Sequence, residues 1–409
     1  MKLKEIIPCS TTTIENNEKQ MIYNRLNEIL KPKAQLDPWK NEHDYFVDFI
    51  NGLSLDHMNE LSYNDPILSY IMDFDKFYCQ IWRKDSEKDF TDSFTLPEII
   101  TSPLPSYLRT YIYDAVNSEN AVPSESTLQT ANMENSKDLF ICRRILEEIF
   151  QIWKDKRYNG RRIGDSTINE GTYLRDFDFI TKMTIRNVDE NLMIDWAEKT
   201  SVSSEFRKTS SEESYNNQMD KKRSYGKKPD ATAVFSLNSK ISELFYLEGS
   251  GPPFIHDVQK WEDDRRKAIR LCNDSKNYMI AKFLDSFHNI NINHIKEIME
   301  IPVISYQFYG TRLKALYFDQ PLAYAPLIPI GRIFCIDEID IPIEPVNSDE
   351  IINLIELIFK ARGILKSSVD SIKKLIRELK NTKINRTKLR TGPAKIISTT
   401  MSTPLKYSR

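Results

Sequence analysis

The hydrophobic pattern of the first half of the chain is helical. Apolar residues recur every three or four positions in 14–31 and again in 138–157. This spacing places apolar side chains on one side of a helix. In 138–157 that face carries Leu139, Ile145, Leu146, Ile149, Phe150 and Trp153. We therefore predict amphipathic helices in both segments.

Beyond residue 229 the pattern becomes extended. Four runs of β-forming residues follow one another, at 231–237, 241–247, 303–308 and 313–318. Asn238–Lys240 separates the first two runs and Tyr309–Arg312 the last two, and both are turn sequences. We predict two hairpins, and two further strands at 330–336 and 338–343.

Long helices complete the predicted elements of this half. Residues 259–284 form a charged helix, and a second helix begins at Asn347 or Ser348, with acidic residues in its first turn. Its apolar spacing continues to Leu379, and Gly363 is expected to break it.

Changes in composition divide the chain into regions. Residues 117–137 are rich in Ser, Asn, Glu and Thr, so we predict a linker there between an α-helical N-terminal region, 1–116, and a folded domain, 138–380. A polar insertion is expected at 201–228 and a basic, disordered tail at 381–409. The predicted fold class of the domain is α/β, a mixed sheet with helices on both faces.

The composition excludes several classes of protein. Eleven glycines in 409 residues are under half the usual frequency, which argues against glycine-rich phosphate loops. Five widely spaced cysteines favour neither a disulfide framework nor a zinc site, and they fit an intracellular, cytoplasmic or nuclear protein. Its first residues have no secretory signal pattern, and the most apolar stretch, 322–336, is interrupted by prolines and Arg332. We expect no membrane partner.

The net charge of −2 hides a strongly basic end. Residues 373–409 hold eleven Lys and Arg against the single acid Glu378. Clustered cations bind polyanions by releasing counterions, although a solvated tail is the simpler alternative. The predicted nucleic-acid-binding residues are Lys373, Lys374, Arg377, Lys383, Arg386, Lys388 and Arg390.

The first hairpin brings two carboxylates together at its open end. A three-residue loop at Asn238–Lys240 pairs Leu237 with Ile241, and in that register Asp230 lies opposite Glu248. Directly opposed Cβ atoms are about 4.5–5.5 Å apart, so both carboxylates stay ionised only with a cation between them. Mg²⁺ prefers carboxylate oxygens, and we predict that Asp230 and Glu248 bind it. The alternative is a surface hairpin with solvated charges.

The motifs at this hairpin resemble the PD-(D/E)XK restriction-endonuclease-like superfamily. The chain reads Lys228-Pro229-Asp230, a hairpin and Glu248-x-Ser250, where the superfamily has Pro-Asp and (D/E)-x-K on adjacent strands. Glu170 matches the acidic residue on the preceding helix. Uncharacterised fungal proteins have the same order of E-x-x-Y, K-x-D and E-x-S-G-P-P. The resemblance covers about residues 138–380.

The resemblance implies a restriction-endonuclease-like fold and Mg²⁺-dependent hydrolysis of phosphodiester bonds in nucleic acid. Asp230 and Glu248 would bind the metal, and Glu170 would assist through water. Ser250 replaces the superfamily's lysine, which stabilises charge at the reacting phosphate. Lys228, opposite Ser250 in the predicted register, or Lys260 would have to supply that ammonium group.

Two other functions remain open at this point. The chain could be an inactive module of the same fold that binds nucleic acid or protein. It could also be a plain interaction protein that binds its partner through the N-terminal region. Solvated Asp230 and Glu248 would favour the interaction protein, and a cleft with no lysine near them would favour the inactive module.

Overall fold

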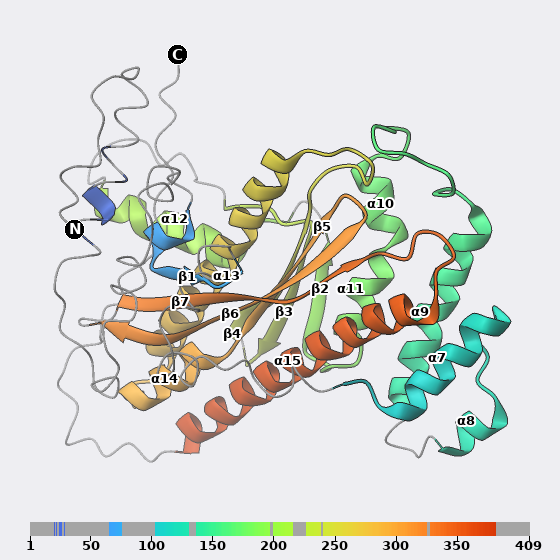
Figure 1. Cartoon of the computed structure of the whole chain (residues 1–409). Coiled ribbons are helices and arrows are strands. Elements are labelled where there is room, and N and C mark those ends of the chain that lie inside the picture. Colours follow the sequence, from blue (N-terminus) through green and yellow to red (C-terminus); the bar gives the residue numbers. More distant parts are fainter. Residues whose placement is uncertain are drawn as a thin grey trace, which may run out of the picture.

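The computed structural model describes residues 65–75, 103–130, 136–196, 199–215, 226–238, 240–324 and 328–381, with a few positions between 20 and 28. Its centre is a seven-stranded mixed sheet in the order β1-β7-β6-β5-β4-β3-β2 (Figure 1). The strands are β1 (Ile71–Asp73), β2 (Leu192–Trp196), β3 (Ala231–Leu237), β4 (Lys240–Gly249), β5 (Val303–Tyr309), β6 (Arg312–Tyr324) and β7 (Ile328–Asp340).

The connections divide the sheet into two antiparallel parts. Strands β2, β3 and β4 form one meander, and β5, β6 and β7 form the other. The two parts meet where β5 pairs parallel to β4. Parallel pairing requires a crossover, which is made by α13 (Val258–Ser286) and α14 (Ile292–Glu300).

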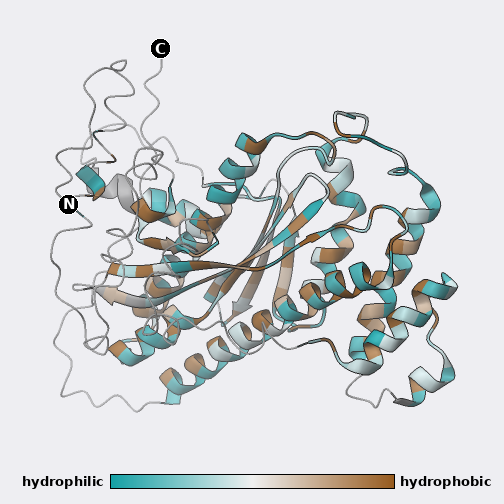
Figure 2. Ribbon diagram, in the orientation of Figure 1, coloured by the Kyte–Doolittle hydropathy of each residue, from teal (hydrophilic) through white to brown (hydrophobic). Residues whose placement is uncertain are grey.

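Helices cover both faces of the sheet. On one face, Tyr246, Val303 and Ile333 cluster with apolar residues of α13. The other face packs against α15 (Ser348–Asn381) and α11 (Asp178–Ile185), with α9 (Ser136–Asp155) and α7 (Ser106–Ser118) outside them. Figure 2 shows hydrophobic and hydrophilic positions alternating along α15, as expected of a helix with one buried face. The predicted α/β class, a mixed sheet between helices, is confirmed.

Shorter elements lie between these layers. They are the 3₁₀ helix η2 (Pro66–Ser69), α8 (Glu125–Thr130), α10 (Glu170–Asp176) and α12 (Val202–Tyr215). Two of them fall where composition predicted only a linker and a polar insertion. The helix α12 forms because it packs against α13, a tertiary contact that its polar composition does not reveal.

Strand β1 lies in the region predicted to be α-helical. Its three residues are too few to give a periodic signal, and pairing with β7 holds them in the sheet. Phe74, directly after β1, stacks on Phe334 at a centroid distance of 4.8 Å. Most of the predicted helix 14–31 and of the tail 381–409 lies outside the described residues.

Two predicted breaks are wrong. The helix α15 runs through Gly363 because its buried face continues on both sides, with Ala361 before the glycine and Ile364 after it. A helical glycine costs only about 1 kcal/mol, less than this burial provides. The strand β7 runs through Asp337, which pairs with Ala315 of β6.

Gly331 of β7 allows the close approach of β1 and β6. A Cβ atom at this position would lie 2.6 Å from Cζ of Phe318 and 3.2 Å from Cγ1 of Ile71. We expect Gly331→Ala to lower the free energy of unfolding by about 1–3 kcal/mol, because the rigid ring cannot move aside without strain. Urea denaturation measures this.

The control is Gly171→Ala in α10, where the nearest atom to an added Cβ lies 3.6 Å away. Alanine is favoured over glycine in helices by about 0.8–1 kcal/mol, so this variant should be at least as stable as the wild type. Equal stability of the two variants would contradict the packing argument.

Candidate functional site

A β-bulge sets the register of the hairpin that carries the candidate site. Leu237 pairs with Lys240, one position away from the predicted register, but the bulge between Ala233 and Val234 shifts the pairing back. From Ala233 back to Ala231, at the open end of the hairpin, the register is the predicted one, and Ala231 pairs with Leu247. The prediction was thus wrong beside the turn and correct at the open end.

Asp230 is held at the start of β3 by the end of β4. Its backbone N–H donates to the Leu247 carbonyl at 3.0 Å, and its Oδ2 accepts from the Gly249 N–H at 2.6 Å. Burial raises the pKa of Asp230, the Gly249 hydrogen bond and the charge of Lys267 oppose this rise, and nearby Glu170 and Asp264 add to it. The pKa of this carboxyl group is therefore raised overall, although Lys267 supplies a compensating charge.

Glu248 is almost completely buried, with 1% of its surface exposed. Its Oε2 accepts from Lys267 Nζ at 2.6 Å, while its Oε1 is buried and has no hydrogen-bond partner among the described residues. Burial raises the pKa of Glu248 to about 8, although Lys267 lowers it. A buried oxygen without a partner is costly unless a ligand satisfies it.

Glu170 reaches the same place from the first turn of α10. The Asn169 side chain caps this helix by accepting from the Thr172 N–H at 2.8 Å. Glu170 Oε2 accepts from Lys260 Nζ at 2.9 Å, and the same ammonium donates to the Gly249 carbonyl at 3.3 Å. Gly249 thus connects two of the predicted carboxylates, because its N–H binds Asp230 and its carbonyl shares the Lys260 ammonium with Glu170. Glu248 is the preceding residue of the same strand.

Gly249 also explains why α10 can pack so closely against the end of β4. A Cβ atom there would lie 2.6 Å from Cδ1 of Leu174, which belongs to α10. The absence of a side chain therefore lets the helix that carries Glu170 pack against the end of β4.

Helix α13 contributes two charged residues that the sequence analysis did not single out. Asp264 accepts from Lys260 at 3.2 Å, and Lys267 holds Glu248. Lys260, Asp264 and Lys267 are four and three positions apart, which places them on one helix face. That spacing is the sequence signal from which these two residues could have been predicted to lie beside Lys260. Burial alone would lower the pKa of Lys260, but Glu170 and Asp264 raise it overall.

The remaining site predictions concern Ser250 and Lys228. Ser250 is fully buried, and its Oγ accepts from the Gln307 side-chain amide at 2.8 Å. Lys228 is exposed, Lys260 donates to Glu170, and Lys267 donates to Glu248. Lys260, one of the two lysines considered for the missing ammonium, contacts the predicted site carboxylate of Glu170.

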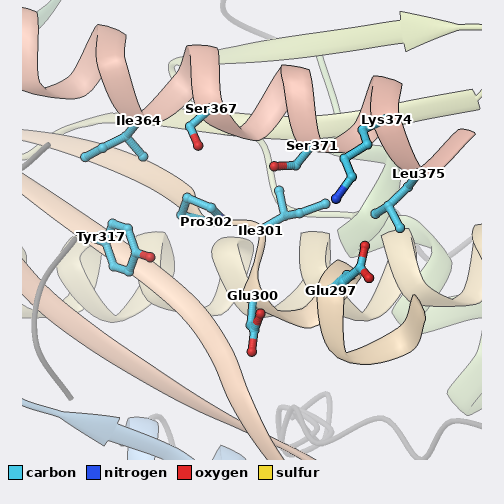
Figure 3. A pocket seen from close by; sticks show the side chains of 10 residues that line it. All are labelled: Glu297, Glu300, Ile301, Pro302, Tyr317, Ile364, Ser367, Ser371, Lys374 and Leu375. Atoms are coloured by element: carbon cyan, nitrogen blue, oxygen red, sulfur yellow. The ribbon is translucent and has the colours of Figure 1, made fainter. Parts of the chain in front are cut away.

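The predicted nucleic-acid-binding residues do not form one described surface, because three lie on α15 and four lie outside the described residues. Lys373 forms an ion pair with Asp189, and Arg377 is exposed on α15. Lys374 lines a cavity of about 300 Å³ between α14 and α15, and in Figure 3 its ammonium and the Glu297 carboxylate point into the same space. The other four predicted residues, Lys383, Arg386, Lys388 and Arg390, lie outside the described part of the chain.

The donor chemistry at the carboxylate cluster fits a divalent cation. Carboxylate oxygens are the preferred ligands of Mg²⁺, and the unpartnered Oε1 of Glu248 is one such ligand without a proton donor. Among the described residues, however, no three His, Cys or carboxylate side chains already stand in a metal-binding arrangement. Lys267 neutralises Glu248 here, so a metal ion held by Glu248 would replace the ammonium group of Lys267.

Neither a search for membrane-spanning helices nor comparison with known proteins points to a function. Within the described residues, no helix combines the length and apolar character needed to cross a bilayer. No protein-family model, curated protein or solved structure matches the chain. The inference of function therefore starts from the geometry of the site.

Proposed function

We propose that the protein hydrolyses phosphodiester bonds of nucleic acid with the help of Mg²⁺, as a restriction-endonuclease-like enzyme. One observation carries the proposal. Glu170, Asp230 and Glu248, which are not adjacent in the sequence, lie close enough that Glu170 raises the pKa of Asp230 and Asp230 raises the pKa of Glu248, and the buried Oε1 of Glu248 lacks a partner among the described residues. A cluster of desolvated carboxylates costs free energy that a purely structural role would avoid.

Asp230 and Glu248 are the residues that would hold the metal ion. When bound, such an ion supplies charge stabilisation at the transferring phosphate. Gly249 fixes the Asp230 carboxylate through its N–H, and the close packing of α10 fixes Glu170. The positions of all three side chains are thereby set before substrate arrives.

Lys260 is the residue that would replace the superfamily's missing lysine. Its ammonium donates to Glu170 and to the carbonyl of Gly249, the residue after the predicted metal ligand Glu248. A fixed cation there stabilises negative charge that develops on the phosphate. The contacts of this lysine argue against the inactive module, in which we expected no lysine at the cleft.

The order of the elements also supports the proposal. Glu170 lies on α10, Asp230 precedes β3, Glu248 lies on the adjacent β4, and α13 follows before the parallel strand β5. This is the order of acidic helix, two neighbouring strands and following helix that the sequence resemblance implies. The near-complete burial of Glu248 argues against the plain interaction protein, for which both carboxylates were expected to be solvated.

The test is cleavage of single-stranded and duplex DNA and RNA by the full chain with Mg²⁺, Mn²⁺ or EDTA. We expect metal-dependent products, with a rate that rises between about pH 6 and pH 9 at subsaturating metal. Glu248 must lose its proton to bind a cation, and burial raises its pKa to about 8. Absence of cleavage with every substrate and both metals would refute catalysis. A rate that falls over this pH range would contradict the role of Glu248.

A further inference from the structure

A second hollow lies directly beside the carboxylate cluster. Its volume is about 530 Å³, and it is enclosed by the loop between β4 and α13, the turn between β5 and β6, and the loop around Arg161. Pockets of about 300–1,000 Å³ are typical of small-molecule sites. Both features lie at the carboxyl ends of β4 and β5, where ligands bind in open α/β sheets.

Three aromatic rings follow one another along this cavity. The rings of His256 and Trp261 are 4.4 Å apart between centroids, and those of Trp261 and Tyr309 are 5.1 Å apart. All three line the cavity, together with Phe254. Gly310, in the turn beside Trp261, has φ of +52°, a backbone conformation that favours glycine. Planar ligands are therefore favoured.

The cavity also presents polar groups of both signs. Arg161 and Arg312 line it, and each is paired with an acid, Arg161 with Asp165 at 2.8 Å and Arg312 with Glu338 at 3.1 Å. A guanidinium has five donors, so these pairs leave others for a ligand. Glu344 supplies an acceptor at the same wall. An aromatic cavity with donors and an acceptor matches the faces and edges of a nucleobase.

One side chain connects the cavity to the carboxylate cluster. The Gln307 amide donates both to Ser250 Oγ at 2.8 Å and to the Trp261 carbonyl at 2.7 Å. Trp261 directly follows Lys260, which holds Glu170. The aromatic wall and the Lys260–Glu170 pair are thus parts of one framework, and a ligand in the cavity would lie close to the carboxylates.

We propose that this cavity binds one unpaired nucleobase of a polynucleotide strand beside the bond to be cut. The proposal deepens the nuclease function and rests on it. Bases that leave the stack are bound between aromatic side chains and read along their polar edges. Such stacking depends little on the identity of the base, because every base has a π-face. The substrate would therefore be single-stranded or locally opened nucleic acid.

The test measures binding without cleavage, by fluorescence anisotropy of the full chain in EDTA. The probes are a labelled oligothymidine of about 12 nucleotides and an abasic strand of equal length and charge. We expect the wild type to prefer oligothymidine about tenfold or more. His256→Ala should remove most of this preference, and His288→Ala is the control, because His288 is also exposed but lies beyond the other end of α13.

Each outcome decides the proposal. Equal affinity of the wild type for both strands, or an unchanged preference in His256→Ala, would overturn it. Displacement of oligothymidine by free thymidine monophosphate at equal affinity would assign the cavity to a free nucleotide and would also overturn it. Asp230→Asn should retain the preference, so loss of cleavage alone leaves base binding intact. Base binding by a wild type that cuts nothing would refute only the nuclease proposal.

Discussion

Asp230→Asn is expected to reduce Mg²⁺-dependent cleavage by about 10³-fold or more and to leave the protein folded. An amide is a neutral, weaker ligand, and charge stabilisation by a bound metal is worth several kcal/mol, with each 1.36 kcal/mol equal to a factor of ten in rate. The fold should persist because the Asn side-chain oxygen can still accept from the Gly249 N–H. Cleavage rates and calorimetric titration with Mg²⁺ measure the two effects.

The matched control is Asp263→Asn on α13. This carboxylate is 54% exposed and pairs with Arg266 at 3.3 Å, outside the cluster. The Asp263→Asn variant removes the same negative charge outside the cluster. Its cleavage rate should therefore stay close to that of the wild type. Loss of cleavage in both variants would indicate a general charge effect, and no loss in Asp230→Asn would remove Asp230 from the metal site.

The hairpin shows how far local sequence rules extend. The turn signal and the alternation of β3 and β4 predicted the pairing of the strands, and the carboxylate pair at their open end follows from it. The position of the turn was wrong by one residue, because Leu237 pairs with Lys240. The bulge at Ala233 compensates for this shift. A bulge has little sequence signature of its own, so its position depends on packing of the finished sheet.

Other features could not be read because they depend on tertiary contacts. Glu170 and Lys260 are 90 positions apart, and their ion pair exists only because Gly249 lets α10 approach β4. Strand β1 is three residues long and is defined by its pairing with β7. By contrast, the long helices were predictable, since their apolar spacing persists over many turns. The predicted break at Gly363 is wrong because the buried face around this residue outweighs the cost of one helical glycine.

The second large expected effect concerns Lys260, which we propose replaces the superfamily's lysine at the position of Ser250. Lys260→Ala is expected to lower the maximal cleavage rate by about 10²–10³-fold, the usual effect of removing one fixed donor from a developing negative charge. Lys228→Ala is the control, because Lys228 is an exposed lysine at the entrance to β3, two residues from Asp230. We expect that variant to cleave nearly as fast as the wild type.

The metal dependence separates a catalytic role of Lys260 from a structural one. Its ammonium neutralises Glu170 and Asp264, so it competes with a divalent ion for the cluster. Removing it should therefore raise the affinity for Mg²⁺ while it lowers the maximal rate, and Lys260→Arg should restore part of that rate. A variant that merely unfolds would lose both affinity and rate. If Lys228→Ala loses cleavage and Lys260→Ala does not, the ammonium opposite Ser250 is the one that acts, and the assignment to α13 is wrong.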